Sequence, residues 1–490
     1  MLQIRDLKFR YSDAERISLS IDRLDISEGE MVLVCGPTGS GKTTLFRCLN
    51  SLIPNFYGGQ FGGHVIVDGT DTRSSTPYEL SSTVGTVFQD PENQFIMLSA
   101  DEEVAFNLRN RGRTEEEIRE DMAEVVSLVE AGNLLERSVV ELSAGQKQRI
   151  AIASVAASRT KYILLDEPTS QLDDQGTESL MKILLGLKRI GHTIIISEHR
   201  IERVAKYCSR FLVMNEGKIE VDGNMWEMER WYEERGISLF RPVSHRGQGH
   251  RSIFSDRAML SVKDLVVDME GLRVLDGVTF SVAGGELAML TGPNGSGKTT
   301  LLKSIMNFIP RQSGAISVDG MAITHLTPVD ISKHVAYLGH NPLSYLFHQT
   351  LLEELIFSAK YSGMSASNPG FLKEKAAAVA SSLGIQPMLE RFPRELSSGE
   401  REIAAIACTL VGGRKIILLD EPTRGMDYWK KEKFMTFLEG LSSGYAKSVL
   451  MTTHDRFLLH SYADRVYRLE EGKIVEAAPE DRCDAEHCRC

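Results

Sequence analysis

Short apolar runs alternate with amphipathic stretches along most of this chain. The runs MVLVC (31–35), YILLD (162–166) and TIIIS (193–197) have the uninterrupted, β-branched character of buried strands. Stretches such as KTTLFRCLN (42–50) and TESLMKILLGLKRI (177–190) instead space their apolar residues as a helix does. This alternation predicts an α/β fold with a mostly parallel sheet and helices on both faces. Functional residues are then expected beyond the carboxyl ends of the strands.

One segment departs from the alternation. Residues from about 100 to 140 are charged and have helical character, which predicts a helical insert. Thr114 and Glu117 have the spacing of a capping box, so a helix of this insert is expected to begin there.

The order of these elements occurs twice. GPTGSGKTTLFRCLNSLIP begins at Gly36 and GPNGSGKTTLLKSIMNFIP at Gly292, an offset of 292 − 36 = 256 residues. YILLDEPTSQLD at Tyr162 is answered by KIILLDEPTRGMD at Lys415. The chain is therefore predicted to be an internal duplication with one domain at 1–239 and a second at 258–480. Residues 240–257 lack a hydrophobic period and are predicted to be a linker.

Composition and charge exclude some classes of protein. A chain of 490 residues is too long for one hydrophobic core, and 42% apolar with 25% charged residues is ordinary for a soluble protein. The net charge of −11 argues against a dedicated nucleic-acid-binding protein. Seven scattered cysteines, an N-terminus unlike a signal peptide and no apolar run of membrane-helix length predict a cytosolic protein, or one held at a membrane by partners.

A glycine-rich loop follows a strand and opens a helix in each half. Glycines allow backbone N–H groups to converge on phosphate oxygens, and the helix N-terminus adds its dipole. A lysine in such a loop reaches the β- and γ-phosphates, and the hydroxyl after it holds Mg²⁺. The predicted ATP-binding residues are Gly36, Pro37, Thr38, Gly39, Ser40, Gly41, Lys42, Thr43 and Thr44, with Gly292, Pro293, Asn294, Gly295, Ser296, Gly297, Lys298, Thr299 and Thr300. Thr43 and Thr299 are the predicted metal ligands among them.

Paired acids end a buried strand in each half. Asp166 and Asp420 are predicted to hold Mg²⁺, while Glu167 and Glu421 are predicted to orient and polarise the attacking water. The alternative is that the strand simply leaves the core on acidic residues. That alternative does not explain why each pair follows its glycine-rich loop at nearly the same distance.

LSAGQ and LSSGE precede a further helix in the two halves. Ser143 with Gln146, and Ser397 with Glu400, have the spacing of capping boxes. Capping alone leaves the glycines of these two segments unexplained.

LSAGQ, placed between the glycine-rich loop and YILLDEPTSQLD and followed by the histidine of ISEH, resembles the ATP-binding-cassette (ABC) ATPases. The resemblance covers nearly all of both halves. It implies two tandem P-loop domains, each with a mostly parallel sheet, an antiparallel β part and an inserted helical subdomain. It also implies that the capped helix of one half points at the γ-phosphate held by the other, so that both capping boxes contact ATP. The residues concerned are Ser143, Gly145 and Gln146 in one half and Ser397, Gly399 and Glu400 in the other.

The same resemblance implies roles for residues outside the loops and acid pairs. His199 and His454 would contact the γ-phosphate, and Tyr11 would stack on adenine. Asp173 and Asp427 match the aspartates that lie between the two cassettes. In VFQDPENQF (87–95), a polar loop at the end of an apolar run, Gln89 would contact Mg²⁺ and the attacking water while its loop faces a transmembrane partner.

FQDPENQ followed by EEVAF, together with SEHRIERV (197–204), is similar to the energy-coupling-factor importers of vitamins and transition-metal ions. This similarity implies an ATP-hydrolysing motor subunit that uses ATP and Mg²⁺ and lies peripherally on the cytoplasmic face of the cell membrane. Its expected partners are transmembrane energising and substrate-binding subunits, with no nucleic acid. Self-association is expected only as secondary to the pairing of the two halves.

Two other twin-cassette classes remain as alternatives. A soluble factor acting on the ribosome has a similar length, but its family has a long charged helical linker, whereas this connection is short and the chain acidic. A tandem-cassette sugar importer commonly has a degraded second P-loop, whereas the loop at Gly292–Thr299 is intact.

The two halves are not equivalent. The replacements in the second half are His340 for Gln89, Tyr345 for Gln94, Met269 for Tyr11 and Glu400 for Gln146. They are consistent either with drift in a tolerant duplicate or with two ATP sites that differ in rate. On the second interpretation the site that contains Gln89 is expected to be the faster one.

The last ten residues, 481–490, form a cysteine-rich tail. CDAEHCRC contains Cys483, His487, Cys488 and Cys490, four soft ligands that a thiophilic metal could take. Their spacing matches no tetrahedral pattern, and terminal tails are usually disordered, so both interpretations stay open.

Overall fold

The computed structural model describes residues 1–237, 239–240, 255–339, 341–362, 368–396 and 398–476. It divides the chain into two compact units, Met1–Leu239 and Phe240–Cys490. Four sequence features lie outside the described residues: linker positions 241–254, His340, Ser397 and the cysteine-rich tail.

Two β-sheets form the frame of the first unit. Its strands are β1 (Leu2–Tyr11), β2 (Leu19–Ile26), β3 (Met31–Cys35), β4 (Gly59–Val67), β5 (Thr70–Asp71), β6 (Val84–Val87), β7 (Tyr162–Asp166), β8 (Thr193–Ser197), β9 (Arg210–Asn215) and β10 (Lys218–Gly223). The larger sheet has the order β10-β9-β3-β8-β7-β6 and is parallel except for β10. The smaller sheet, β2-β1-β4-β5, is antiparallel.

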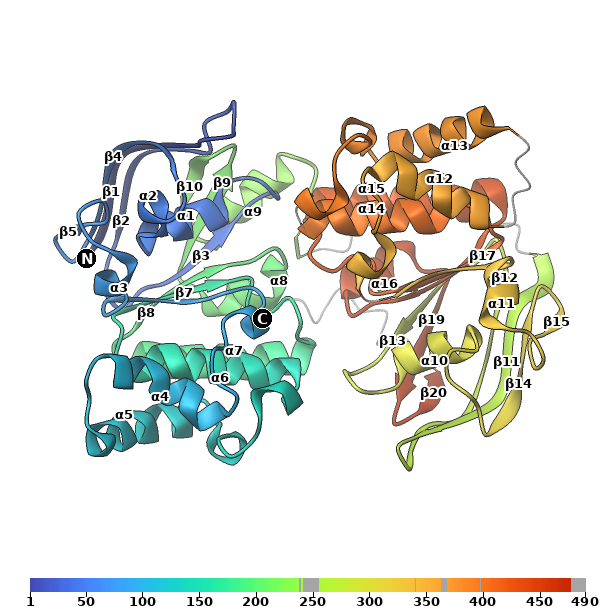
Figure 1. Ribbon diagram of the computed structural model, residues 1–490, viewed down its shortest axis with the longest axis horizontal. Coiled ribbons are helices and arrows are strands. Elements are labelled where there is room, and N and C mark those ends of the chain that lie inside the picture. Colours follow the sequence, from blue (N-terminus) through green and yellow to red (C-terminus); the bar gives the residue numbers. More distant parts are fainter. Residues whose placement is uncertain (238, 241–254, 340, 363–367, 397, 477–490) are drawn as a thin grey trace. The chain divides into compact units, whose positions relative to one another are not determined.

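The helices of the first unit pack on both faces of the larger sheet (Figure 1). They are α1 (Lys42–Leu49), α2 (Leu52–Asn55), α3 (Pro77–Leu80), α4 (Ala100–Asn110), α5 (Glu115–Leu128), α6 (Ala144–Ala157), α7 (Asp174–Arg189), α8 (Ile201–Val204) and α9 (Met225–Glu233). Helices α4 and α5 form the predicted insert, and the predicted capping box of Thr114 and Glu117 begins α5. Leu45 and Phe46 of α1 share one buried cluster with residues of both sheets. Helix α1 begins at Lys42, directly after the left-handed Gly41.

The second unit repeats this topology. Its strands are β11 (Ser255–Met269), β12 (Leu272–Gly284), β13 (Leu287–Thr291), β14 (Ser313–Val318), β15 (Met321–Ala322), β16 (Val335–Leu338), β17 (Ile416–Asp420), β18 (Ser448–Thr452), β19 (Arg465–Glu470) and β20 (Lys473–Glu476). The orders β16-β17-β18-β13-β19-β20 and β12-β11-β14-β15 match those of the first unit strand for strand. Its helices are α10 (Lys298–Ile305), α11 (Pro328–Ser332), α12 (Leu351–Tyr361), α13 (Pro369–Ser382), α14 (Ser398–Leu410), α15 (Tyr428–Glu439) and α16 (Arg456–Tyr462). The predicted fold class is confirmed.

This topology places the predicted chemistry at one edge of each larger sheet. Strands β3, β8, β7 and β6 are adjacent and parallel, so their carboxyl ends meet at the same edge. The glycine-rich loop follows β3, the acid pair ends β7, and the residues 198–199 follow β8. Among the described residues, none of the helices has the length and apolar character needed to span a bilayer.

Candidate active sites

The glycine-rich loops have backbones that only glycine fits. Gly36 has a φ of 138°, and a Cβ atom there would lie 2.0 Å from the carbonyl oxygen of Met214. Gly292 has a φ of 146°, and its Cβ would lie 2.1 Å from the carbonyl oxygen of Leu469. Both glycines let the loop turn tightly against the neighbouring strand and present its N–H groups outward.

A buried lysine begins the helix after each loop. Lys42 Nζ donates to the carbonyl oxygens of Gly36 and Pro37, at 2.9 and 3.0 Å. Lys298 makes the matching pair of contacts in the second unit, at 2.7 and 3.0 Å. Each ammonium group is thus held against its own loop, where it supplies the positive charge that a polyphosphate needs.

The loop residues also leave hydrogen-bonding capacity unused. The hydroxyls of Ser40 and Ser296 are buried and have no hydrogen-bond partner. A buried hydroxyl without a partner is costly, and a phosphate oxygen placed in the loop would satisfy it. The other predicted residues of the turn between strand and helix are Thr38, Gly39 and Gly41 in the first unit and Asn294, Gly295 and Gly297 in the second. The loop residues therefore fit a bound triphosphate.

The predicted metal ligands lie next to each other in both units. Thr43 Oγ1 donates to Asp166 Oδ2 at 2.9 Å, and Thr299 Oγ1 donates to Asp420 Oδ2 at 2.8 Å. A hydroxyl beside a carboxylate supplies the hard oxygen ligands that Mg²⁺ prefers. Burial raises the pKa of Asp166 above its ordinary value. A bound cation would offset that burial, so the donor set fits Mg²⁺.

A second hydroxyl holds each of these aspartates, and sequence reasoning did not identify it. Ser197, the last residue of β8, donates to Asp166 Oδ1. Thr452, the last residue of β18, donates to Asp420 Oδ1 at 2.8 Å. Each aspartate is therefore gripped on both oxygens, which fixes its orientation toward the loop. A hydroxyl at the end of a strand next to the acid-bearing strand was the available signal.

Glu167 joins two other predicted residues. Its Oε2 accepts a hydrogen bond from Gln89 Nε2 at 2.8 Å, and its Oε1 lies 2.7 Å from Nε2 of His199. The backbone of Glu167 is left-handed, with a φ of 50°. Burial alone would raise the pKa of the Glu167 carboxyl, but His199 and Lys42 together hold it below its ordinary value. The carboxylate is therefore kept ionised, as a base acting on water requires.

The second unit repeats the acid and histidine. Glu421 has a φ of 51°, and its Oε1 lies 2.9 Å from Nε2 of His454. His340, which stands at the position of Gln89, lies outside the described residues.

The polar loop after β6 and the corresponding loop after β16 each contain an internal hydrogen bond from a backbone N–H to a side chain. The backbone N–H of Phe88 donates to Oε1 of Gln94 at 3.1 Å. At the corresponding place the N–H of Gly339 donates to the hydroxyl of Tyr345 at 2.7 Å. The replacement of glutamine by tyrosine therefore preserves this contact rather than removing it.

The LSAGQ segment begins α6 as predicted. The N–H of Gln146 donates to Ser143 Oγ at 3.4 Å, and Gln146 Oε1 accepts from the N–H of Ser143 at 2.9 Å. Gly145 lies in the first turn of α6, and Gly399 and Glu400 lie in the first turn of α14. Asp173 and Asp427 cap α7 and α15 by accepting from backbone N–H groups, each at 2.8 Å.

Tyr11 lies beside the start of α1. Its hydroxyl is 3.3 Å from Thr44 Oγ1 and accepts from Arg47 at 3.1 Å. Met269 takes the same place in the second unit, where its sulfur accepts from Thr300 Oγ1 at 3.9 Å. The two side chains are structural counterparts, but only the first offers an aromatic ring.

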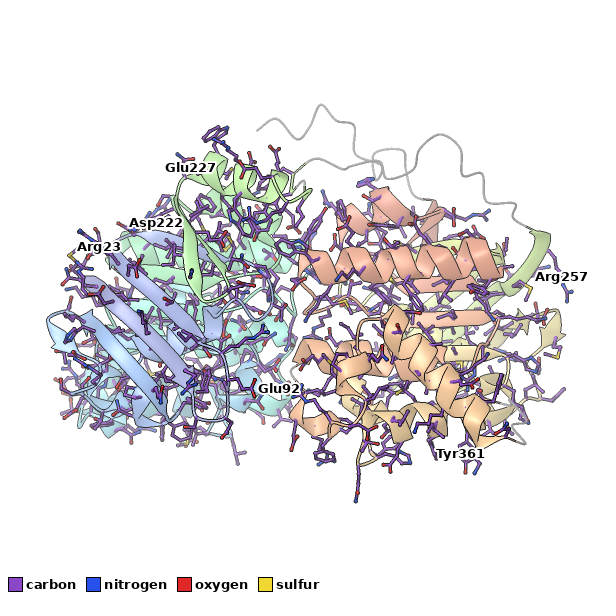
Figure 2. The ribbon with its side chains drawn as sticks, turned by 90° about the horizontal axis from the view of Figure 1, so that it is seen from above. Arg23, Glu92, Asp222, Glu227, Arg257 and Tyr361 are labelled. Atoms are coloured by element: carbon purple, nitrogen blue, oxygen red, sulfur yellow. The ribbon has the colours of Figure 1, made fainter. Side chains whose placement is uncertain are left out.

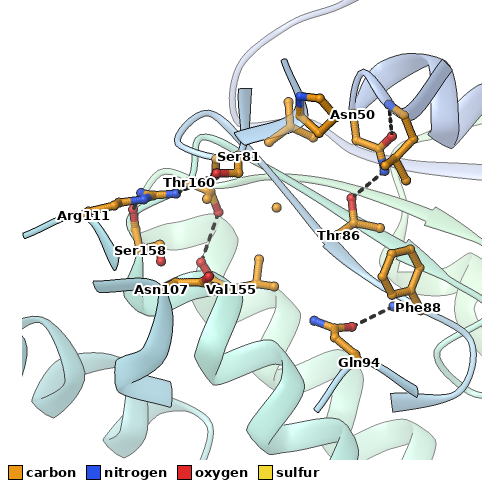
Figure 3. Close-up of a pocket in the computed structure, with 14 residues that line it drawn as sticks. Asn50, Ser81, Thr86, Phe88, Gln94, Asn107, Arg111, Val155, Ser158 and Thr160 are labelled. Carbon is orange, nitrogen blue, oxygen red and sulfur yellow. Dashed lines mark hydrogen bonds between the residues drawn. The ribbon is translucent and has the colours of Figure 1, made fainter. Parts of the chain in front are cut away.

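A cavity of about 200 Å³ adjoins the polar loop of the first unit (Figure 3). Its lining mixes polar and apolar side chains, and the polar ones include Asn50, Thr86, Gln94, Asn107 and Arg111. Arg111 donates to the carbonyl oxygens of Ser81 at 2.8 Å and Ser158 at 3.2 Å. Burial lowers the pKa of this guanidinium.

The corresponding cavity of the second unit is larger, about 320 Å³, and aromatic. Its lining includes Phe308, Tyr337, Tyr345, Phe347, Phe357 and Tyr361. Arg414 also lines it and donates to the carbonyl oxygen of Ser332, the counterpart of Ser81, at 2.5 Å. The two arginines come from different positions in their units, one after α4 and the other just before β17.

The glycine-rich loop with its buried lysine, followed by strand-end acids at the same edge of a parallel sheet, is the arrangement found in P-loop nucleoside-triphosphate hydrolases. A family model described as "ABC transporter" matches residues 19–170 and 275–424, and a model described as "AAA domain" matches residues 390–460. The chain belongs to the ABC transporter family, and it is an ATP-hydrolysing enzyme with two cassettes.

Two relatives align over nearly the whole chain. A protein of Methanosarcina mazei, provisionally described as an ABC transporter ATP-binding protein, is 32% identical over 99% of this chain and 96% of its own length. A Treponema denticola protein of the same description is 32% identical over 97% of this chain and 96% of its own length.

Solved structures resemble either the whole chain or one half. An archaeal ribosome recycling factor, solved with a ribosomal stalk protein, has a TM-score of 0.65 and 22% identity, covering 96% of this chain and 89% of its own; this likeness shows the fold alone. The protein cbiO1 of Clostridium perfringens, described as part of the ABC transporter complex cbiONQ, is 32% identical with a TM-score of 0.43. It covers 48% of this chain and 94% of its own.

Proposed function

We propose that this chain is the motor subunit of an energy-coupling-factor importer. It would drive uptake of a vitamin or a transition-metal ion through separate membrane subunits. The observation that carries the proposal is the loop after β6, which contacts the acid on one side and a cavity on the other. Gln89 donates to Glu167, and Phe88 and Gln94 of the same loop line the cavity. A partner docked there would be coupled to the state of the ATP site through one short segment.

The surface around this loop suits an apolar partner. Phe88, Ile96 and Leu98 are exposed in the first unit, Leu98 by 77%. In the second unit Phe347 and Tyr361 are exposed, and Tyr361 is seen at the surface in Figure 2. Exposed apolar side chains that gather at one place mark interaction sites. We place the protein peripherally on the cytoplasmic face of the cell membrane, held there by transmembrane subunits.

The chemistry proposed for the first cassette follows from the contacts described. Lys42 and the loop N–H groups would bind the phosphates, and Thr43 and Asp166 would hold Mg²⁺. Bound Mg²⁺ supplies charge neutralisation to the phosphates. Glu167, kept ionised, would take a proton from the attacking water, which Gln89 would orient. The second cassette would use Lys298, Thr299, Asp420, Glu421 and His454 in the same roles.

We assign the remaining predicted residues from the family resemblance. His199 would contact the γ-phosphate and Tyr11 the adenine ring. The capped helix starts would contact the γ-phosphate of ATP bound by the other cassette, through Ser143, Gly145 and Gln146 or through Ser397, Gly399 and Glu400. A charged phosphate at a helix start is favoured by the helix dipole.

Affinity purification of the full chain from detergent-solubilised membranes tests the proposal. Small membrane proteins should co-purify, and liposomes containing that complex should take up solute only when ATP is supplied. A Glu167→Gln, Glu421→Gln double variant should assemble equally well and transport nothing. Recovery of ribosomes instead of membrane proteins would refute the proposal and favour the translation-factor alternative.

A further inference from the structure

A second buried carboxyl lies behind the proposed catalytic pair of the first cassette. Glu198 stands between the end of β8 and His199, and it is only 2% exposed. Its Oε1 accepts hydrogen bonds from the backbone N–H of Thr169 at 2.8 Å and from the Thr169 hydroxyl at 2.6 Å. Its Oε2 accepts from the backbone N–H of His199 at 3.2 Å. The proposed mechanism gives the Glu198 carboxyl itself no role.

These contacts join the segment after Glu167 to the segment that contains His199. Thr169 lies two residues after Glu167, on the loop that leaves β7. The backbone N–H of Glu198 also donates to the carbonyl oxygen of Val34, in the strand that leads into the glycine-rich loop. The Glu198 side chain therefore links the loop that follows Glu167 to the backbone of His199. Glu198 itself is held at the end of β8 by its hydrogen bond to β3.

In the described part of the second cassette, the corresponding position carries no carboxyl group. Thr453 stands at the position of Glu198, and its backbone N–H donates to Leu290 at 3.1 Å, so the strand itself is placed as in the first unit. Its hydroxyl accepts instead from the backbone N–H of Asp455 at 3.1 Å. Asp455 in turn pairs with Lys431 of α15 at 2.8 Å, and both side chains are buried. Asp455 thus anchors the segment carrying His454 to α15, whereas in the first cassette Glu198 joins the histidine segment to the acid's own loop.

We propose that Glu198 is a positioning residue for ATP hydrolysis in the first cassette, holding Glu167 and His199 in the mutual placement that catalysis uses. The inference rests on the proposed catalytic roles of those two residues. Glu198 is buried and lies outside the glycine-rich loop, so the proposed mechanism gives it no contact with ATP. Its loss should therefore lower kcat while ATP binding, which depends on the glycine-rich loop, is retained.

The test compares Glu198→Leu, Glu198→Gln and Glu167→Gln in the full chain. Glu198→Leu keeps a side chain of similar size and removes every side-chain hydrogen bond of Glu198. It should reproduce most of the kcat loss of Glu167→Gln, about 10- to 100-fold. Glu198→Gln keeps one acceptor oxygen and should recover part of that loss. KM for ATP should stay within about twofold in both Glu198 variants. Adding Glu198→Leu to Glu167→Gln should lower kcat no further, because the two act as a unit.

Glu103 provides the matched control. It is also a buried glutamate of the first unit and accepts from two backbone N–H groups, those of Ile96 and Met97 at 2.9 and 2.8 Å. Glu103→Gln should lower the melting temperature as Glu198→Gln does but leave kcat unchanged. If Glu198→Leu does not fold, Glu198→Gln against Glu103→Gln decides the matter.

The outcomes separate two failures. If Glu167→Gln leaves kcat unchanged, the proposed mechanism is wrong. If Glu167→Gln lowers kcat but the Glu198 variants match the Glu103 control, or change KM rather than kcat, Glu198 is a structural residue and the inference is overturned.

Discussion

Replacing Gly36 by alanine should destroy one ATP site and leave the other intact. The added Cβ would lie 2.0 Å from the carbonyl oxygen of Met214, far inside the distance that two such atoms tolerate. Gly39 in the same loop is the matched control, because it also has a positive φ, 80°, but a Cβ there meets no atom within 4 Å.

The two substitutions should therefore differ in cost. Gly39→Ala adds only the left-handed backbone penalty, about 1–2 kcal/mol. Gly36→Ala combines the same backbone strain with a steric overlap between the new Cβ and a carbonyl oxygen. Together these should cost about 3–6 kcal/mol. Since Met214 belongs to the buried strand β9, the glycine-rich loop is the part that must move. A loss of that size corresponds to ATP binding weakened about 10²- to 10⁴-fold at this loop.

Isothermal titration calorimetry with ATP measures the effect directly. The wild-type chain should bind two nucleotides, and Gly36→Ala should bind one, through the loop that contains Lys298. Gly39→Ala should keep two sites, the first with affinity reduced by no more than about 30-fold. Two undiminished sites in Gly36→Ala, or an equal loss in Gly39→Ala, would refute this account of the loop.

Four further results are expected. Glu167→Gln should lower steady-state ATP hydrolysis about 10- to 100-fold and by a larger factor than Glu421→Gln; the reverse would assign the faster site to the second cassette. Chelation of Mg²⁺ should stop hydrolysis while circular dichroism stays unchanged. Tyr345→Phe should remove the acceptor of the Gly339 N–H and cost about 1 kcal/mol, seen as faster hydrogen exchange in that loop. Burial lowers the pKa of His192, so its contribution to stability is present above its ordinary pKa of 6.5 and lost as the pH falls below it. Urea midpoints of wild type and His192→Asn should accordingly converge on acidification.

The fold and the choice of candidate site residues followed from local sequence. The strand before Gly36 and the helix after it could be predicted because an apolar run and a helical period flank the glycines. Asp166 and Glu167 were identified because they end an apolar run. Thr43 and Asp166 were each predicted as metal ligands, and they are hydrogen-bonded to each other. The capping box at Ser143 needed only a four-residue pattern, and the structure confirms it.

Specific hydrogen-bond partners could not be predicted from the sequence when they depend on the three-dimensional placement of side chains. Tyr345 was noted only as a replacement of Gln94. Neither residue type indicates that both side chains accept a hydrogen bond from the backbone N–H at equivalent positions of the two loops. The role of Glu198 depends on the position of Thr169, which the sequence places 29 residues away. Its one visible signal was an acid immediately before His199 where the second half has a threonine.

The arginines beside the two cavities constrain how the cassettes could be recombined. The end of α4 supplies Arg111 to the Ser81 carbonyl, whereas α12 offers Ser362 at that place and Arg414 arrives from elsewhere. A chimera that transplants α12 into the first cassette would leave that carbonyl without its cation. The reciprocal graft would crowd two guanidinium groups onto a single acceptor. The two cassettes share one topology, but α4 and α12 could not be exchanged without disturbing this contact.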